Sequence, residues 1–319
     1  MIGLFAVLSS TSMVASSRAP VAVIGATGNV GRLAVKELVE QGYPVRILQR
    51  SAAPGKDSVA ASLAAMPGVE SVQGDVNDAA SVRLLLQGCS ACLAVHGAGR
   101  KRKLSDLWLD AEADPTHSKL INYEGVRTII QAAQASGTCG RVVRITGKGE
   151  TPWSIFSILI NGLGSMAKAW NYEGENLLRA CPDVEYTIVR PGVMSTLEVD
   201  DTPPASLALA DDGGDLKVSR IAHAAIASLC VQCLRYPNAG RCTLTAMSVP
   251  PGEGASSWAP LLATVKPDRR AFRTDLLQEH RRAVAVGGAA LAVVAAAFAA
   301  AAGAAVRLLV LALLGLFTP

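Results

Sequence analysis

The sequence is poor in aromatic and charged side chains: of its 319 residues, 4% are aromatic and 18% are charged. The formal net charge of +4 is small, and no basic stripe with interleaved aromatic residues is visible. Proteins that bind nucleic acid through their surface usually carry such a stripe. The composition therefore predicts no nucleic-acid partner.

Cysteine is present but not in a pattern that predicts a metal site. Two of the seven cysteines form the pair Cys89/Cys92 and two form the pair Cys230/Cys233. Four thiols at this spacing would suit zinc. However, Cys92 begins an apolar run and the second pair lies in an apolar helical stretch, so small buried side chains in a reducing compartment are the favoured interpretation. We predict no metal site.

Apolar residues make up half of the chain, which is a high fraction for a soluble protein. The excess lies near the C-terminus, where residues 283–306 run for 24 positions without a charge. As a helix this run is long enough to cross a hydrocarbon layer of about 30 Å. Arg307 then interrupts it, and a charge at mid-bilayer is costly. The segment is a transmembrane candidate, with a buried alanine-rich packing helix as the alternative.

The charges around this run predict its orientation. Arg281 and Arg282 precede it directly, whereas no charged residue follows Arg307. By the positive-inside rule, the preceding domain stays on the cytosolic or plastid-stromal side. We therefore predict a membrane protein with a single C-terminal span.

Residues 1–19 form a leader whose role the sequence leaves open. The stretch MIGLFAVLSSTSMVASS has apolar and small residues, as signal peptides do, but no Lys or Arg precedes its apolar part. A signal peptide, a disordered leader and a serine-rich plastid-targeting segment all remain alternatives.

Residues 20–249 alternate short β-branched runs with helical stretches, which is typical of a parallel sheet covered on both faces. We expect strands at 21–24, 45–49, 69–72, 91–95, 141–146, 184–189 and 241–245. We expect helices at 29–40, 56–65, 79–86, 119–136 and 219–234, and a long helix that ends near residue 179. The prediction is an α/β fold: a doubly wound parallel sheet of Rossmann type, then a charged linker at 250–282, the apolar helix at 283–306 and a short apolar tail at 307–319.

A glycine-rich turn follows the first expected strand. Residues 21–31 read VAVIGATGNVG, so Gly25, Gly28 and Gly31 fall between a strand and a helix. Such glycines permit a tight turn, close approach of the backbone to a pyrophosphate, and close packing of helix on strand. The helix N-terminus adds free N–H groups and a positive dipole end. We therefore predict a dinucleotide-binding loop, which also includes Thr27, Asn29 and Val30.

The second expected strand lacks the acid that selects NAD. It reads PVRILQR and ends in Arg50, with no carboxylate nearby. A guanidinium suits the 2′-phosphate of NADP, so NADP is the favoured cofactor and NAD the less favoured one. The alternative is that Arg50 is simply a solvated strand end.

Two further turns belong to the same edge of the sheet. After the third strand, Asp75 and Val76 are placed to contact adenine, and after the fourth, Gly97 and Ala98 are placed beside the pyrophosphate and ribose. The predicted partner is therefore a nicotinamide dinucleotide.

Several motifs together resemble a known family. They are GATGNVG at 25–31, GDVND at 74–78, INYEGV at 121–126, YTIVRPGVM at 186–194 and VSRIAHA at 218–224. Over residues 20–247 the chain resembles an atypical short-chain dehydrogenase/reductase of the NAD(P)-binding, NmrA-like kind. The resemblance implies that Asn122 lies near the site on the central helix and Thr146 at the end of the fifth strand. It also implies that Pro191, Gly192 and Val193 line the nicotinamide pocket.

The chain departs from that family at the catalytic pair. Reducing members carry Tyr-x-x-x-Lys, in which Lys lowers the phenol pKa and Tyr moves the proton. In the register set by Asn171-Tyr-Glu-Gly-Glu, the Lys position holds Asn171 and the Tyr position holds Ala167. Lys168 lies one helical turn before Asn171 and is either a ribose ligand or an exposed helix lysine. Tyr172 follows Lys168 in the reversed order and is not predicted to be catalytic. Thr146, Lys168 and Asn171 remain weak catalytic candidates.

The connection between residues 97 and 118 is unusually long. It carries four adjacent cations at 100–103 and then an acidic stretch that contains Trp108. Long loops at this edge of a parallel sheet collect substrate and partner contacts. The cations suit a phosphate, an acidic protein partner or a lipid head group, or they form a solvated loop. His96, Trp108 and His117 are candidate pocket residues, while His223 is expected in the core and His280 in a basic collar at 273–282.

Two functions are consistent with these features. One is a membrane-anchored, NADP-dependent oxidoreductase that acts on a small or lipophilic substrate. The other is a non-catalytic NADP-binding scaffold or redox sensor at a membrane. The missing Tyr/Lys pair favours the second, whereas the glycine loop and pocket motifs fit both.

Overall fold

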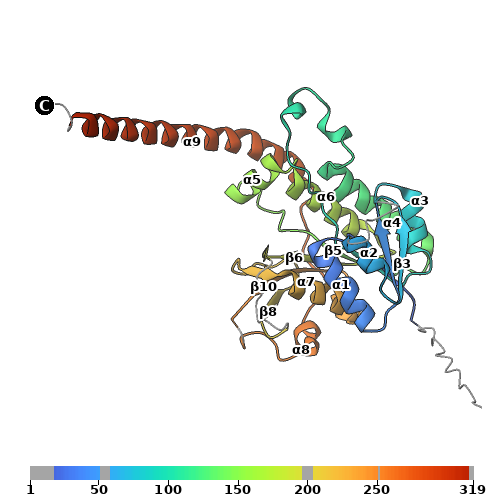
Figure 1. Cartoon of the computed structure of the whole chain (residues 1–319). Coiled ribbons are helices and arrows are strands. Elements are labelled where there is room, and N and C mark those ends of the chain that lie inside the picture. Colours follow the sequence, from blue (N-terminus) through green and yellow to red (C-terminus); the bar gives the residue numbers. More distant parts are fainter. Residues whose placement is uncertain (1–17, 51–57, 196–203, 251, 316–319) are drawn as a thin grey trace, which may run out of the picture.

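A predominantly parallel eight-stranded sheet organises the chain (Figure 1). The computed structural model describes residues 18–50, 58–195, 204–250 and 252–315. The strand order is β3-β2-β1-β4-β5-β6-β10-β8, and only the β10–β8 pair is antiparallel. This order reverses between β1 and β4, as in doubly wound Rossmann sheets. The predicted fold class is therefore confirmed, although residues 1–17 of the predicted leader lie outside the described residues.

The strands agree closely with the runs of β-branched and apolar residues. Their bounds are β1 (Val21–Ile24), β2 (Val45–Gln49), β3 (Val69–Gln73), β4 (Ala91–Ala94), β5 (Arg141–Ile145), β6 (Glu185–Pro191), β7 (Val193–Ser195), β8 (Leu207–Ala210), β9 (Arg220–Ala222) and β10 (Cys242–Ser248). Strands β7 and β9 form a separate parallel pair beyond the end of β6. The sequence did not predict β7, β8 and β9, because each strand is short and pairs with a strand that lies far away in the sequence.

Helices cover both faces of the sheet. Their bounds are α1 (Asn29–Glu40), α2 (Val59–Ala64), α3 (Ala79–Leu86), α4 (Gly125–Ser136), α5 (Ile155–Leu163), α6 (Ala167–Ala180), α7 (His223–Cys233), α8 (Trp258–Ala263) and α9 (Leu276–Gly315). Short turns occupy η1 (Leu104–Leu107), η2 (Ala111–Ala113), η3 (Leu120–Glu124) and η4 (Pro237–Ala239). Alternate residues of β1 enter two separate cores: Val21 and Val23 pack with α1 and α7, whereas Ala22 and Ile24 pack with α3 and α4. This alternation is why the central strands read as continuous apolar runs.

Three predicted helices differ in detail. The expected helix at 119–136 begins with a π-helical turn, η3, before α4. The expected helix at 219–234 begins as strand β9, and α7 starts only at His223. The long helix expected to end near residue 179 is two helices, because Ser165 and Met166 both have positive φ and turn the chain between α5 and α6.

Helix α9 extends away from the domain as a single rod (Figure 1). It begins seven residues before the uncharged run, and its base is docked through the buried residues Leu276, His280 and Ala283. His280 was expected in a basic collar at 273–282, and the structure buries it: its Nε2 donates to Gly149 O at 2.7 Å and its Nδ1 lies 2.9 Å from Asn161 Nδ2. Residues 276–308 are long and apolar enough to cross a membrane by length and composition, and almost none of their most apolar window is buried.

Candidate functional site

A cavity of about 690 Å³ opens beside the carboxyl ends of β1, β2 and β4. This is the point where the strand order reverses, the usual ligand site in open α/β sheets. The residues that line it are Ile24, Gly25, Thr27, Gly28, Leu48, Gln49, Arg50, Ala60, Asp75, Val76, Val95, His96, Gly97, Ala98, Gly99, Arg100, Thr116 and Ile121. Eight of the predicted cofactor residues therefore share one cavity, namely Gly25, Thr27, Gly28, Arg50, Asp75, Val76, Gly97 and Ala98.

The three glycines of the first turn are required for different reasons. Gly25 has φ +90°, and a Cβ there would come within 2.7 Å of His96 N on the neighbouring loop. A Cβ on Gly31 would lie 2.1 Å from Gly25 O, so Gly31 allows the helix to pack on the turn. Gly28 lines the cavity, and a Cβ on it would meet only Gly25 O at 3.2 Å. The lack of a side chain at Gly28 is therefore needed more for the space in the cavity than for the packing of the fold.

The N-terminus of α1 faces this turn without a competing anion. Gly28 caps the helix with no side-chain hydrogen bond, and the first turn contains no acidic residue. The first N–H groups of a helix lack intrahelical partners and carry a partial positive charge. Asn29, Val30 and Gly31 form this first turn and lie outside the cavity lining. Their backbone geometry fits a diphosphate, which is the group that Rossmann turns hold.

The end of β2 presents a cation to the cavity. Arg50 is exposed, whereas Asp75, which also lines the cavity, follows β3 and accepts the Asn77 N–H at 2.9 Å. Gly74 lies so close to α3 that a Cβ would be 2.1 Å from Ser81 Cβ. The carboxylate is therefore held beside β3 and not at the tip of β2, where an acid would meet ribose hydroxyls.

His96 is the neutral polar group of the cavity wall. Its Nε2 lies 3.2 Å from Ile121 O, and because a carbonyl only accepts, Nε2 carries the proton. Nδ1 is then an acceptor, buried with no hydrogen-bond partner among the described residues. Burial and the nearby Arg144 lower the pKa of His96 well below its usual value, so the ring stays neutral. This acceptor is itself buried, so it lies behind the surface of the cavity wall and not on it.

Arg144 on β5 is the residue that sequence reasoning missed. Its guanidinium is buried and donates to the carbonyls of Ala94, at 3.0 Å, and His96. It also donates to Asn171 Oδ1 at 2.9 Å and to Asn122 Oδ1 at 3.4 Å. Burial lowers the pKa of Arg144 to about 10. The available signal was a charged residue among the apolar residues of β5, Val142, Val143 and Ile145, which is unusual without a function or a partner.

Asn122 and Asn171 lie behind the cavity and hold its wall. Asn122 is buried, and its Oδ1 accepts the Ala98 N–H at 3.2 Å while its Nδ2 donates to Ala167 O at 3.5 Å. Asn122 therefore links the loop after β4 to α6. Together with Arg144, the two asparagines form a polar layer that fixes the carbonyls at the end of β4.

The Lys168 side chain contacts α5 and does not line the cavity. Its Nζ donates to Ser157 Oγ on α5 at 2.6 Å, and it is absent from the cavity lining. Burial, with Lys148 and Arg190 nearby, lowers the pKa of Lys168 to about 8. Tyr172, four residues later, is buried and packs so closely under Gly149 that a Cβ on that glycine would lie 2.6 Å from Tyr172 Cβ. Lys168 and Tyr172 therefore do not form a dyad at the cavity.

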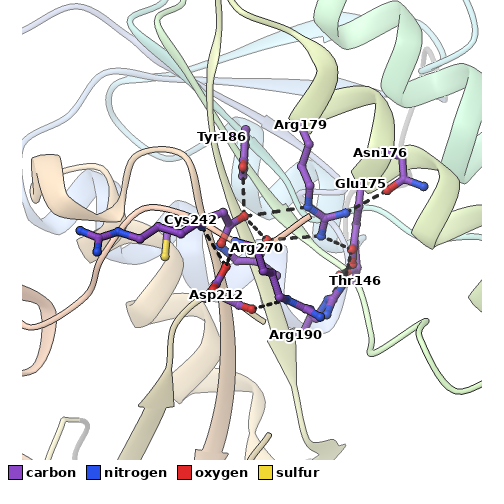
Figure 2. A network of polar contacts seen from close by, with 12 residues as sticks. Thr146, Glu175, Asn176, Arg179, Tyr186, Arg190, Asp212, Cys242 and Arg270 are labelled. Atoms are coloured by element: carbon purple, nitrogen blue, oxygen red, sulfur yellow. Dashed lines mark hydrogen bonds and ion pairs between the residues drawn. The ribbon is translucent and has the colours of Figure 1, made fainter. Parts of the chain in front are cut away.

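Thr146 belongs to a buried ion-pair network (Figure 2). Its hydroxyl donates to Glu175 Oε1 at 2.6 Å, and the same carboxylate accepts from Arg190 Nε at 3.0 Å and Arg179 Nη2 at 2.6 Å. Burial by itself would raise the pKa of Glu175, but Arg190 and Arg179 lower it overall. The network joins β5, β6 and α6, so the Thr146 hydroxyl serves the fold.

The other candidates are dispersed. Pro191 ends β6, Gly192 approaches Ser219 O so closely that a Cβ would lie 2.3 Å away, and Val193 is exposed on β7. None of these three lines the cavity beside β1. His117 is buried, and its Nδ1 accepts the Lys119 N–H at 3.1 Å, whereas Trp108 is exposed. His223, expected in the core, is half-buried at the start of α7.

The seven cysteines are all free and buried. Burial raises the pKa of the Cys92 and Cys230 thiols, which opposes thiolate formation. No group of three or more candidate metal ligands occurs among the described residues.

The profile of a family described as NAD(P)H-binding matches residues 25–237, which is more than half of the chain. Protein TIC 62, chloroplastic, from Pisum sativum is 26% identical over 183 residues, covering 54% of this chain and 32% of that protein. Divinyl chlorophyllide a 8-vinyl-reductase, chloroplastic, from Oryza sativa subsp. indica is 30% identical over 190 residues, covering 56% of this chain and 40% of that protein. The matches span less than half of the length of these relatives.

Two solved structures share the fold. A short-chain dehydrogenase/reductase (wide type) from Veillonella parvula in complex with NADP has a TM-score of 0.56 at 11% identity, covering 75% of this chain and 99% of that chain. The oxidoreductase ylbE from Lactococcus lactis has a TM-score of 0.56 at 14% identity, covering 79% and 100% of the two chains.

Proposed function

Because this chain belongs to the NAD(P)H-binding family, we propose that it is an NADP(H)-dependent oxidoreductase whose dinucleotide lies in the cavity beside β1, β2 and β4. The observation that carries this proposal is that Gly28 of the glycine-rich turn and Arg50 at the end of β2 line the same cavity. The uncapped start of α1 would hold the diphosphate, since it offers free N–H groups and no competing carboxylate.

Arg50 supports NADP over NAD. Its guanidinium would pair with the 2′-phosphate, while Asp75 is held after β3 by its own turn. Val76, which is buried beside Asp75, would contact the adenine. The neutral His96 would form part of the wall, and Gly97 and Ala98 would approach the ribose.

When bound, the dinucleotide supplies a hydride at C4 of its nicotinamide. The protein would hold the dinucleotide in place. Arg144 and Asn122 fix the loop after β4, so that residues 96–98 form a rigid wall of the cavity. The positions of the Tyr/Lys pair hold Ala167 and Asn171, and Thr146 is bound to Glu175. Any proton that the reaction requires would therefore come from another group or from solvent. This favours substrates that accept the hydride without a proton from a tyrosine.

We further propose that α9 anchors the protein in a membrane and that the substrate is lipophilic. The uncharged run at 283–306 supports the anchor, because almost none of it is buried against the domain. The two curated relatives are chloroplastic by name, which supports a plastid membrane. Arg281 and Arg282, which precede the run, support the stromal side for the Rossmann domain.

A non-catalytic NADP(H) sensor is the second candidate, and one observation favours it. Asn171 Oδ1, at the position of the family's lysine, is already bound to the buried Arg144. The site then binds the dinucleotide without a group to move a proton, and the polar layer of Arg144, Asn122 and Asn171 would transmit occupancy to α6.

One experiment separates the two candidates. The purified full chain, in detergent, is mixed with NADPH carrying deuterium at C4 and with a panel of aldehydes, ketones and conjugated alkenes, in whose products a transferred deuteride stays on carbon. Deuterium in a product, lost in Gly28→Val, supports the oxidoreductase. Micromolar binding of NADPH without deuterium transfer to any acceptor supports the sensor, and no binding of either dinucleotide contradicts both.

A further inference from the structure

Helix α5 exposes an apolar face. Its sequence, IFSILINGL, contains no charged residue, and it begins at a serine cap, Ser154, whose side chain accepts the Ser157 N–H. Phe156 is 66% exposed and Leu163 is 67% exposed. Exposed apolar residues on the same helix also include Ile155, Leu159 and Ile160. A contiguous apolar face of this kind marks an interaction surface.

A second apolar segment lies beside the end of α5. The Arg102 N–H donates to Leu163 O at 2.8 Å, which ties the long loop to the helix. Just after this contact the loop exposes four large apolar side chains, Leu104, Leu107, Trp108 and Leu109, each more than 60% exposed. We call the exposed apolar residues of α5 and of this loop the apolar platform.

The base of α9 completes the same region. A Cβ on Gly287 would come within 2.5 Å of Ile158 Cδ1, and one on Gly162 within 3.8 Å of Val284. A cavity of about 1010 Å³ lies between α5, the loop and α9. Its apolar wall on α9 extends from Val284 to Ala295. Figure 1 shows α9 leaving the domain above α5.

These contacts set the depth of α5 relative to the candidate span. The uncharged run starts at Ala283, and a helix rises about 1.5 Å per residue, so Gly287 lies about 6 Å into it. Ile158 packs at that level. If the run crosses a bilayer, α5 lies at the boundary between head groups and acyl chains, where amphipathic helices bind.

Cations flank the platform on both sides, and some of them are paired with acids of the same loop. Exposed cations lie at residues 101–103 in the loop and at 281–282 before the uncharged run. Lys103 pairs with Asp114 and Arg281 with Glu112, whereas no ion pair is formed by Lys101, Arg102 or Arg282 among the described residues. Trp108 and Trp153 lie in the loop and at the start of α5, and tryptophan is enriched at membrane interfaces. Cations beside an apolar surface favour an anionic lipid layer.

We infer that the apolar platform is a membrane-docking surface: α5 lies in the plane of an anionic bilayer and the loop at 104–109 inserts beside it. This inference rests on the proposed anchoring by α9 and adds that the Rossmann domain itself is seated on the membrane. The cavity between α5 and α9 then opens to the acyl chains. Its apolar wall would be covered by lipid, with Arg102 and Arg281 near the phosphates.

The test uses single-tryptophan versions of the full chain in vesicles of phosphatidylcholine with phosphatidylglycerol. Each version keeps Trp108, Trp153 or Trp258, and the other tryptophans are changed to Phe. Trp258 on α8 is the control, since α8 lies at the end of the molecule away from α9 (Figure 1). Lipids brominated on their acyl chains quench only nearby tryptophans. We expect strong quenching of Trp108, intermediate quenching of Trp153, whose Nε1 donates to Glu279 just before the uncharged run, and little quenching of Trp258.

A matched pair of variants tests the platform directly. Phe156→Glu with Leu159→Glu should reduce the quenching of Trp153 at least twofold, whereas Leu84→Glu on α3, which is also exposed, should not. If the chain floats with the vesicles but Trp108 and Trp153 are quenched no more than Trp258, the docking inference is overturned and the anchor stands. If the chain does not float with vesicles, the anchor and the docking both fail. If Trp153 is shielded from lipid and from aqueous acrylamide alike, a second copy covers α5 and the inference is overturned.

Discussion

Arg144 on β5 donates a 2.9 Å hydrogen bond to Asn171 on α6, and the guanidinium is fully enclosed by protein. In reducing relatives, as the family resemblance implies, the position of Asn171 holds a lysine. A lysine here would bring a second cation against a buried guanidinium that has no carboxylate in hydrogen-bond contact among the described residues. The neutral amide at 171 and the buried arginine at 144 are therefore mutually dependent.

Asn171→Lys should destabilise the fold instead of restoring a reductase site. Arg144 would lose the amide oxygen that accepts its hydrogen bond, and the new ammonium would repel the buried guanidinium. We expect the free energy of unfolding to fall by about 3 kcal/mol or more. Urea denaturation measures the loss. Asn171→Asp, which offers Arg144 a carboxylate, is the control and should cost much less. Equal stability of Asn171→Lys and wild type would contradict the proposed dependence.

Gly28→Val should abolish dinucleotide binding while the fold persists. A Cβ at Gly28 meets only Gly25 O at 3.2 Å, but a side chain there fills the place of the pyrophosphate. We expect the dissociation constant for NADPH to rise by roughly a hundredfold or more, measured by fluorescence titration. Gly31→Ala is the contrasting variant: its Cβ would lie 2.1 Å from Gly25 O, so it should lower the melting temperature as well. Retained affinity in Gly28→Val would remove the cavity from consideration as the binding site.

Arg50→Asp should shift preference from NADP toward NAD. The change removes the cation that would pair with the 2′-phosphate and adds an acceptor for the ribose hydroxyls. The ratio of the two dissociation constants should change by roughly ten- to a hundredfold, as expected for one charge-assisted hydrogen bond. Arg83→Asp, on the outer face of α3, is a charge-matched control. If both variants leave the ratio where it is in the wild type, Arg50 does not select the cofactor.

Glu175→Gln should cost at most about 3 kcal/mol of stability at pH 7, because it removes the carboxylate that Arg190 and Arg179 share and leaves Arg190 paired with Glu150 alone. The pKa of Glu175 is lower in the folded protein than its ordinary value of 4.5, so the ionised carboxylate stabilises the fold above that value. This advantage is lost as the pH falls below 4.5 and through the folded pKa. The stability difference between wild type and Glu175→Gln should therefore shrink on acidification, measured by urea unfolding at pH 7, 5 and 4. A difference that grows toward low pH would contradict this assignment.

Deleting residues 296–319 should convert an integral protein into a peripheral one. The remaining uncharged helix, 283–295, is about 20 Å long and too short to span a bilayer, yet it keeps the contacts of Val284 and Gly287 with α5. Carbonate should then extract the chain from membranes, with NADPH binding retained. Deleting only residues 308–319 leaves the candidate span whole and should leave the chain resistant to carbonate. Full-length chain in the soluble fraction would mean that α9 packs on protein instead.

The cavity beside β1, β2 and β4 was predictable because its parts are local. The glycine spacing at 25–31 defines a turn, and each βα connection delivers its residues to one edge of a parallel sheet whatever the distant packing. For this reason the sequence alone places Arg50, Asp75 and Gly97 at one site. The predicted order of strands and helices followed from periodicity. Its errors are the start of α7, the break at Ser165 inside one predicted helix, and the three short strands β7, β8 and β9 that were not predicted, and at each of these places tertiary contacts decide.

Sequence by itself thus determined the order of the central strands and helices, the glycine turn and the apolar run at the C-terminus, because each depends on neighbours within a few residues. Only the tertiary structure decided what Arg144, Thr146, Lys168 and His280 do. Each meets a partner more than ten residues away, respectively at Asn171, Glu175, Ser157 and Gly149. The energy of a buried charge or hydroxyl depends on that distant partner and on exclusion of water, and no local pattern encodes either.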